Sequence, residues 1–324
     1  MTDASIAYEL LDFGDGRKLE RFGPSTLDRP CAAAEGAPKA RPELWRAATA
    51  RYDRTQGDQG VWTPKSSLPP NWSVSFLIDL NSRGPTARRP LPATTTIAAR
   101  WCPVAANEQS KPITLTFQLH ASPFGHVGVF PEQRENWEWI ARQVVKSQAA
   151  LRRPLRVLNL FAHTGGSTLA AAAAGAEVVH IDAARNIVDR ARRNAEISGL
   201  ADRTIRWIAE DAARFCQREL KRGNRYDAAI LDPPSYGHGP KGEPWKIADD
   251  LLPLLTLCGE LTADRRAFVV VTCHTPGMGP AELAAYLAEG IVGHCGQPPD
   301  AGELFLTTRG GRRLPSGVVA RWPA

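Results

Sequence analysis

The stretch from Leu155 to Asp182 constrains the fold more than any other part of the chain. It reads LRVLNLFAHTGGSTLAAAAAGAEVVHID: an apolar run ends at glycines, an alanine-rich helical segment follows, and a second apolar run ends in a carboxylate. This pattern predicts a strand, a glycine turn, a helix and a second strand. Glycines let a backbone approach a ligand closely, and an acid about 20 residues later accepts hydrogen bonds from ribose hydroxyls. The stretch therefore predicts a nucleoside-binding unit.

Strand and helix patterns alternate along the rest of the chain. The expected strands cover 156–162, 177–182, 204–209, 226–232 and 267–273, and the expected helices cover 132–150, 167–174, 184–198, 211–222, 246–261 and 280–289. This alternation predicts an α/β fold with a doubly wound, mostly parallel sheet that has helices on both faces. The stretches 303–308 and 318–322 predict a hairpin near the end of the chain.

The first 125 residues differ in texture from the rest. Two alternating stretches flank Gly14–Gly16 as in a hairpin, two more strands are expected over 73–80 and 113–120, and tryptophans are scattered between proline-rich connections. We expect these aromatic rings in a core rather than as stacking platforms. The sequence thus predicts a smaller β-rich N-terminal region over 1–125, a candidate for substrate recognition, and a nucleoside-binding domain over 126–324.

The composition is that of a globular protein large enough for two domains. The chain has 324 residues, of which 43% are hydrophobic and 23% are charged. No window reaches the roughly 18 apolar residues that a membrane span requires, and the N-terminus lacks the basic start and apolar core of a signal peptide. We therefore expect a cytoplasmic protein. The six cysteines are scattered, with neither a CxxC pair nor metal-ligand spacing, so we expect no disulfide framework and no metal.

Positive charge suggests one class of partner. The formal net charge is +6, and arginines cluster at 88–89, 152–156, 185–193, 218–225 and 309–313. Guanidinium groups suit phosphate, which makes a nucleic acid plausible. Solvated helix faces explain any single cluster equally well, so charge alone does not identify the partner.

Informative residues follow three of the predicted strands, at the sheet edge where ligands of such folds bind. Gly165 and Gly166 stand together after His163, which departs from GxGxxG and argues against a nicotinamide-dependent oxidoreductase. Asp182 is a candidate ribose ligand, and Asp211 could face an adenine amino group. Either aspartate could instead cap a helix, since aspartate is a favoured N-cap.

The fourth strand ends in the most informative motif, Asp232-Pro-Pro-Ser-Tyr-Gly. The two prolines remove amide donors and fix the backbone, so Asp232 and nearby carbonyls are held rigidly at the sheet edge. A rigid acceptor of this kind suits a planar nucleobase. A chance Asp-Pro-Pro turn is the alternative.

Together these residues resemble a known family. Asn159-Leu-Phe-Ala-His-Thr-Gly165, Asp182, Ala191-Arg-Arg-Asn194, Asp211 and Asp232-Pro-Pro are similar to the motifs of class I S-adenosylmethionine-dependent methyltransferases, and most similar to the bacterial group that includes 23S rRNA cytosine-C5 methyltransferases. Phe130-Pro-Glu-Gln-Arg134 is similar to that group's FxDQR-like motif, which lies beside the cofactor. The resemblance implies a seven-stranded sheet whose last strand is antiparallel.

The resemblance also implies a cofactor and a partner. S-adenosylmethionine is the expected cofactor, and RNA, ribosomal RNA in particular, is the expected methyl acceptor; a homodimer is left open. The expected cofactor-binding residues are Gln133, Asn159, Phe161, Ala162, Thr164, Gly165, Asp182, Asp211 and Asp232.

The end of the fifth predicted strand bears on the chemistry. Carbon 5 of cytosine is a poor nucleophile, so its methylation needs a thiolate that adds at carbon 6 and a base that removes the carbon-5 proton. Thr-Cys273-His274 is similar to the Thr-Cys-Ser motif that supplies this nucleophile, with His274 in place of the serine. If Cys273 is the nucleophile, Asp232 would bind the base edge, and a neutral His274 could help activate the thiol. A small buried cysteine is the alternative.

Other functions remain open at this level. An exocyclic amine could be the acceptor, although Ser235 separates Pro234 from Tyr236 in the motif expected for that chemistry. The expected substrate-binding residues are Pro233, Pro234, Tyr236 and Lys241. The glycine-rich loop 237–246 could contact substrate, form a lid or be a plain surface loop. Two further alternatives remain: a methyltransferase that acts on a small molecule, and a protein that binds a nucleoside without catalysing a reaction.

Overall fold

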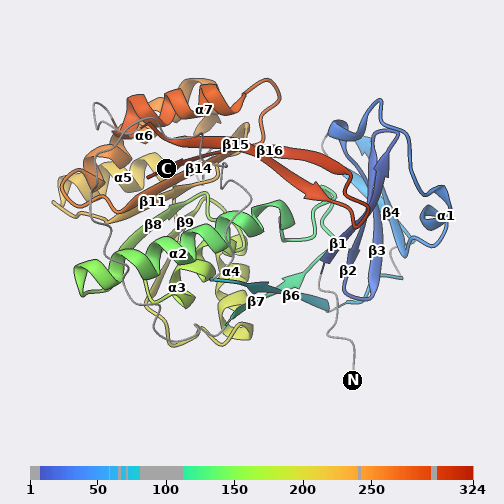
Figure 1. The fold of residues 1–324 in the computed structure, drawn as a ribbon, viewed down its shortest axis with the longest axis horizontal. Helices are drawn as coiled ribbons and strands as arrows, with labels where there is room; N and C mark the ends of the chain where they lie inside the picture. Colours follow the sequence, from blue (N-terminus) through green and yellow to red (C-terminus); the bar gives the residue numbers. More distant parts are fainter. Residues whose placement is uncertain are drawn as a thin grey trace, which may run out of the picture.

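The computed structural model of this chain describes residues 8–57, 59–64, 67–70, 72–80, 112–239, 242–292 and 298–323. A seven-stranded sheet forms its centre (Figure 1). In spatial order the strands are β10 (Ile205–Ala209), β9 (Glu177–Asp182), β8 (Arg156–Leu160), β11 (Ala228–Leu231), β14 (Phe268–Cys273), β16 (Arg313–Trp322) and β15 (Asp300–Thr307). The first five are parallel, and β16 runs antiparallel to both of its neighbours. The predicted doubly wound sheet is confirmed, including its antiparallel last strand.

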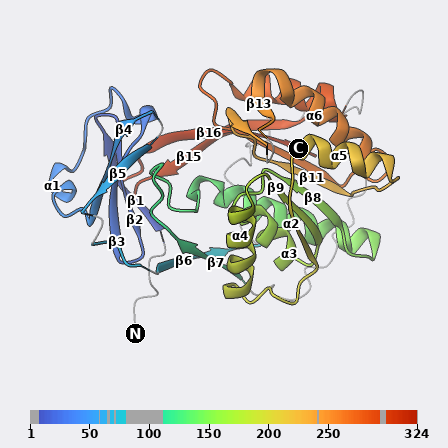
Figure 2. The same ribbon diagram turned by 180° about the vertical axis from the view of Figure 1, so that it is seen from behind.

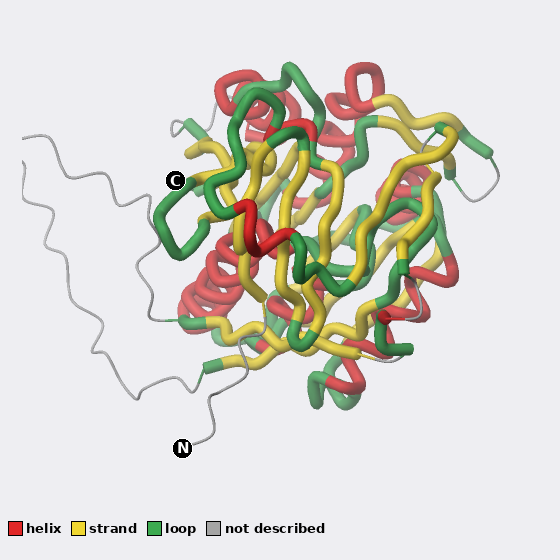
Figure 3. Tube along the Cα trace, turned by 90° about the vertical axis from the view of Figure 1, so that its right-hand side faces the viewer, coloured by secondary structure: helices red, strands yellow, loops and turns green. Residues whose placement is uncertain are grey.

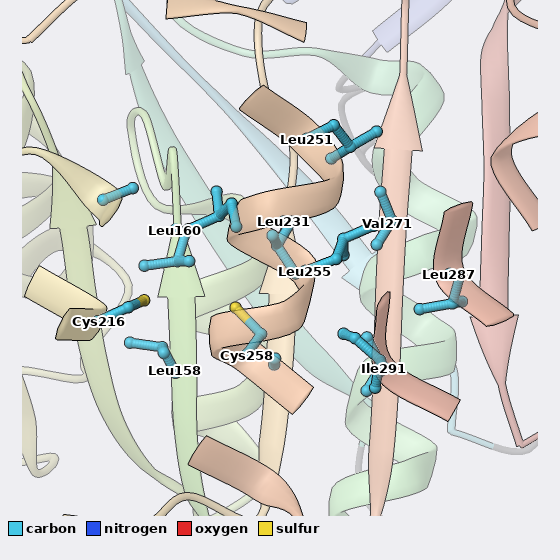
Figure 4. Close-up of a cluster of buried hydrophobic side chains, with 14 of the residues drawn as sticks. Leu158, Leu160, Cys216, Leu231, Leu251, Leu255, Cys258, Val271, Leu287 and Ile291 are labelled. Atoms are coloured by element: carbon cyan, nitrogen blue, oxygen red, sulfur yellow. The ribbon is translucent and has the colours of Figure 1, made fainter. Parts of the chain in front are cut away.

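Helices cover both faces of the sheet. One face carries α2 (Arg134–Leu151), α3 (Gly166–Ala173) and α4 (Arg185–Ile197), and the other carries α5 (Ala212–Lys221), α6 (Ile247–Thr262), α7 (Pro280–Leu287) and the π-helix η4 (Ala288–Val292). Alternation within β8 explains the two cores. Val157 packs towards α2 and α3, whereas Leu158 and Leu160 pack towards α5 and α6 (Figure 4).

The N-terminal region forms a second, antiparallel-rich sheet. Its strands are β1 (Tyr8–Gly14), β2 (Arg17–Phe22), β3 (Ser25–Pro30), β4 (Ala50–Gln56) and β5 (Gln59–Thr63), in that spatial order, with η1 (Ala32–Ala34) and α1 (Pro42–Trp45) between them. Figure 3 looks at the molecule from the side of this sheet. The expected hairpin at Gly14–Gly16 joins β1 to β2. Trp62 and Trp72 are buried, as expected, whereas Trp45 is only half-buried. Trp101 lies outside the described residues.

A hairpin connects the two sheets through a shared core. Strands β6 (Trp72–Ile78) and β7 (Ile113–Leu119) pair with each other and pack against α2, α3 and α4. The rings of Phe76 and Phe117 lie 5.4 and 5.3 Å from the Trp137 ring of α2. The same core includes Tyr52 and Trp62 of the N-terminal sheet. The packing is therefore continuous across the boundary that the sequence predicts at residue 125.

The C-terminal hairpin makes a second connection (Figures 1 and 2). Its far end packs Leu306 and Leu314 against Leu10 of β1. Arg312 at the hairpin turn pairs with the buried Asp12 at 2.6 Å. One element of the central sheet is thus anchored in the N-terminal sheet. Within the described ranges, no helix combines the length and apolarity that a membrane crossing requires.

Candidate active site

A cavity of about 560 Å³ opens at the carboxyl ends of the parallel strands. We distinguish two of its walls. The glycine-turn wall consists of Phe161, His163, Asp182 and Asp211, which follow or end β8, β9 and β10. The loop wall consists of His126, Phe130 and Glu132, which precede α2. Asp232, Pro233, Pro234 and His274 lie with both walls around the same space.

The turn after β8 has a strained backbone. Phe161 and His163 have positive φ values of 53° and 46°, which non-glycine residues rarely adopt, and Gly165 has a φ of 96°. Such strain persists only where the surroundings over-determine it, typically at ligand sites. A Cβ at Gly166 would lie 2.5 Å from the Trp137 ring, so this position accepts no larger residue without a shift. The glycines therefore allow both the turn and its packing on α2.

Asp182 and Asp211 combine structural contacts with a place in the cavity. Asp182 accepts hydrogen bonds from the backbone N–H groups of His163 (2.9 Å) and Ala184 (3.0 Å). Asp211 caps α5 by accepting from the N–H of Arg214 at 2.9 Å. Both also line the cavity. The two roles predicted for these aspartates, ligand binding and helix capping, therefore do not exclude each other.

A smaller cavity of about 30 Å³ follows the glycine turn. Gln133, Asn159, Ala162 and Thr164 line it, so four more of the expected cofactor-binding residues lie close together. Gly165, which was also expected, lines neither cavity but begins α3 as its N-cap. Asn159 is buried and donates to Thr168 at 2.8 Å, and Thr164 donates to the carbonyl of Gly128 at 2.6 Å. These two hydrogen bonds fix the position of the glycine turn.

Asp232 is the most connected residue of the site. One carboxylate oxygen accepts from the Thr272 hydroxyl at 2.5 Å, and the other accepts from the Gln133 amide at 3.2 Å. Asn136 in turn donates to the Gln133 carbonyl at 2.6 Å, which fixes the orientation of that amide. Burial opposes ionisation of Asp232, but its bonds to His274 and Thr272 outweigh burial and lower its pKa. The group is therefore held as a carboxylate.

His274 pairs with this carboxylate, and here the sequence-based expectation was wrong. Its Nε2 lies 3.4 Å from Asp232, and its Nδ1 donates to the carbonyl of Ser316 in β16 at 2.8 Å. Burial disfavours the charged ring, yet the hydrogen bond and charge of Asp232 prevail and raise the pKa of His274 to about 9. The ring is a cation at neutral pH, not the expected neutral imidazole. Both ring nitrogens have partners in the structure, Asp232 and the Ser316 carbonyl.

Cys273 ends β14 as predicted, but its side chain points into the core and not into the cavity. Successive side chains of a strand face opposite sides of the sheet. Thr272 and His274 take the side of Asp232, so the Cys273 thiol packs into the core beneath α6 and α7, with 1% of the residue exposed. Its sulfur accepts from the N–H of Thr275 at 3.3 Å. The thiol is close to the site in sequence yet outside the cavity lining.

The expected substrate-binding residues separate in the structure. Pro233 and Pro234 line the cavity, whereas Tyr236 is 76% exposed and does not. Lys241 lies outside the described residues. Trp245 of the same loop does line the cavity: its indole N–H donates to the carbonyl of Pro234 at 2.7 Å, and its ring lies 4.8 Å from that of Phe161.

Sequence reasoning did not assign a site role to any residue of the loop wall. The Phe130 ring lies 5.5 Å from the His126 ring and 5.2 Å from the His163 ring. The FxDQR-like motif and the glycine-rich stretch before it were the available signals, but only Gln133 was selected from them. A glycine-rich loop beside a motif at a helix start could have pointed to its neighbours.

The N-terminal sheet holds this loop in position. The Tyr52 hydroxyl donates to the carbonyl of Pro123, and the Trp62 indole donates to the carbonyl of Ser122, each at 2.8 Å. Arg29 donates to the carbonyl of Gly125 at 2.9 Å. A Cβ at Gly125 would lie 2.6 Å from the Tyr52 ring, so the loop packs directly on that ring. The loop wall is thus anchored from outside the central sheet.

A family profile and a solved structure both match this chain, and both concern the same class of enzyme. The profile of the S-adenosylmethionine-dependent methyltransferase family matches residues 112–289. The crystal structure of an S-adenosylmethionine-dependent methyltransferase from Agrobacterium tumefaciens superposes with a TM-score of 0.80 at 33% identity, covering 98% of this chain and 90% of that one.

Curated relatives match over shorter stretches. Ribosomal RNA large subunit methyltransferase I of Aeromonas salmonicida is 35% identical over 114 residues, which is 35% of this chain and 27% of the relative. A 23S rRNA uracil-C5 methyltransferase of Neisseria lactamica is 37% identical over 87 residues, which is 27% of this chain and 19% of the relative. The matches thus span about a quarter or less of the length of these two relatives.

Proposed function

The chain belongs to the S-adenosylmethionine-dependent methyltransferase family, and on that premise we propose that it methylates a base of large-subunit ribosomal RNA. The observation that carries this proposal is the presence of Asp232, Pro233 and Pro234 in one cavity with Asp182 and Asp211. A fixed carboxylate beside two rigid, apolar proline rings suits a planar base, and the other two carboxylates suit a nucleoside. Similarity to the two curated ribosomal RNA methyltransferases supports ribosomal RNA as the acceptor.

The residues present fit S-adenosylmethionine. The cavity volume lies in the range of about 300–1,000 Å³ that small-molecule sites occupy, and the positive φ of Gly165 leaves backbone open to close approach. Asp182 would accept from the ribose hydroxyls, and Asp211 would accept from the adenine amino group. The other residues assigned to the cofactor are Gln133, Asn159, Phe161, Ala162, Thr164, Gly165 and Asp232. When bound, the cofactor supplies an activated methyl group.

Asp232 would orient the acceptor base. As a carboxylate with a lowered pKa it accepts hydrogen bonds, and Thr272, Gln133 and His274 fix its position. A preorganised acceptor loses little entropy when the base docks. Pro233, Pro234 and Trp245 would form the surface on which the base lies.

Two chemistries at the acceptor atom each have one observation in their favour. Cytosine carbon 5 would need the Cys273 thiolate to add at carbon 6, and the position of Cys273 directly between Thr272 and His274 at the end of β14 favours this route. An exocyclic amine needs only an acceptor for its hydrogen, and the burial of the Cys273 thiol away from the cavity favours that route. For the first route the Cys273 side chain must rotate out of the core.

One experiment tests the function and separates the two chemistries. Purified protein is incubated with methyl-labelled S-adenosylmethionine and large-subunit ribosomal RNA transcribed in vitro, and the modified nucleoside is identified by mass spectrometry. We expect one labelled base. Cys273→Ser abolishes transfer if the product is 5-methylcytidine and leaves it intact if an amine is methylated. Cofactor binding without transfer to any RNA would instead support a nucleoside-binding protein without catalysis.

A further inference from the structure

Glu132 lines the cavity and has a buried carboxylate oxygen that accepts no hydrogen bond from the described residues. Its side chain is half-buried, and its Oε2 is shielded from solvent with no hydrogen-bond partner among the described residues. Such an oxygen is costly to keep because it has lost its water without gaining a donor. A ligand that brings an N–H or O–H group into the cavity would remove this cost.

The position of Glu132 indicates which part of the cavity such a ligand would occupy. Residues Pro131–Gln133 form a single 3₁₀ turn, η3, in which neighbouring side chains point about 120° apart. Gln133 lines the small cavity along the glycine turn, whereas Glu132 lines the large one with Asp232, Pro233 and His274. Glu132 therefore lies in the large cavity, the one that also contains the proline surface proposed for the acceptor base.

The surroundings of Glu132 suit a nucleobase. Phe130 precedes it by two residues and also lines the cavity, so an aromatic surface and a hydrogen-bond acceptor occur side by side. The charge of Glu132 is one of the influences that raise the pKa of His274, so the two groups are within electrostatic reach of each other. A carboxylate acceptor beside an aromatic ring matches a base edge that carries an N–H group.

We propose that Glu132 accepts a hydrogen bond from an N–H group on the pairing edge of the acceptor base, with Phe130 stacking against the ring. This role rests on the proposed methylation of RNA. It makes Glu132 a residue that selects and orients the base, distinct from the residues assigned to the cofactor. The main competing ligand is the ammonium group of the cofactor's amino-acid portion, and the test separates the two.

The test compares Glu132→Gln and Glu132→Ala with the wild type, using ribosomal RNA transcribed in vitro and S-adenosylmethionine. Glu132→Gln keeps the shape of the side chain and guards against a folding defect in Glu132→Ala. Glu282→Gln, on the exposed surface of α7, serves as the matched control. We expect kcat/KM for RNA to fall about 50-fold in Glu132→Ala and about fivefold in Glu132→Gln, since hydrogen bonds to charged acceptors are the stronger ones. The Kd for S-adenosylmethionine stays within twofold of wild type.

Three other outcomes overturn the role. A Kd for S-adenosylmethionine that rises tenfold or more in both variants would assign Glu132 to the cofactor. Unchanged kcat/KM for RNA in an active Glu132→Ala variant would remove the role but leave the proposed function intact. A wild-type protein that binds the cofactor and methylates no RNA would fail the proposed function itself, and the role would fall with it.

Discussion

The two carboxylates of the glycine-turn wall are held by contacts between residues close in sequence, whereas the loop wall is held by contacts from distant parts of the chain. Asp182 binds the N–H groups of residues 19 positions before it and two positions after it. Tyr52 and Pro123, in contrast, are 71 positions apart, and Trp62 and Ser122 are 60 apart. One wall is therefore a property of a local strand–turn–helix unit, and the other is a property of the assembled fold.

This difference suggests a division of labour. The glycine-turn wall carries Asp182 and Asp211, which are assigned to the cofactor, and the loop wall carries Phe130 and Glu132, which are proposed for the acceptor. Changes in the N-terminal sheet should then alter acceptor binding while the affinity for S-adenosylmethionine is preserved. Asp232 lies in the cavity with both walls, so its loss should weaken both cofactor binding and acceptor binding.

The largest effect is expected for Asp232→Ala. Losing the carboxylate removes the proposed base acceptor and leaves Gln133, Thr272 and His274 without their common partner. Methyl transfer to ribosomal RNA should fall on the order of 10³-fold. Labelled-methyl incorporation measures this, with Asp249→Ala on the exposed start of α6 as the control. Transfer at the wild-type rate would remove Asp232 from the mechanism.

Asp182→Asn should affect the cofactor alone. A hydrogen bond to a charged acceptor contributes about 1.5–3 kcal/mol, so the Kd for S-adenosylmethionine should rise about 10- to 100-fold by calorimetry. The KM for RNA at saturating cofactor should stay near wild type. Asp189→Asn, on the exposed surface of α4, is the matched control. Equal losses for cofactor and RNA would break the distinction between the two walls.

Tyr52→Phe tests the opposite wall. The variant loses only the hydroxyl that donates to the Pro123 carbonyl, which contributes about 1 kcal/mol. The KM for RNA should rise about fivefold, and the Kd for S-adenosylmethionine should not change. Tyr286→Phe on α7 provides the control, since Tyr286 lies outside the N-terminal sheet and outside the cavity lining. A change in cofactor affinity alone would contradict an anchoring role for the N-terminal sheet.

The smallest effect concerns the pH dependence of His274. Its pKa in the folded protein, about 9, exceeds the usual 6.5, so its ion pair stabilises the fold fully below pH 6.5 and is lost as the pH rises through 9. The effect should be small because 37% of the side chain is exposed and solvent screens the pair. The difference in Tm between wild type and His274→Gln should therefore shrink between pH 6.5 and pH 10. A constant difference would show that the pair does not titrate in this range.

Most of the central fold and one wall could be predicted from the sequence. The glycine turn, Asp182 and Asp211 belong to short segments whose periodicity and turn residues specify their conformation. The side-chain direction of Cys273 was not predicted, because a motif gives the position on a strand but not which face the neighbouring helices cover. His274 was expected to be neutral, because Asp232 is 42 residues away in sequence and their contact exists only once β11 and β14 pair.

The sequence by itself determined the doubly wound sheet, the glycine turn and the acids at the ends of its strands, since these depend on local patterns and on the chirality of strand–helix units. Only the tertiary structure decided which residues complete the cavity. His126, Phe130 and Glu132 reach it because the N-terminal sheet fixes their loop through Tyr52, Trp62 and Arg29. Those contacts join segments more than 50 residues apart, and short sequence patterns do not encode such pairings.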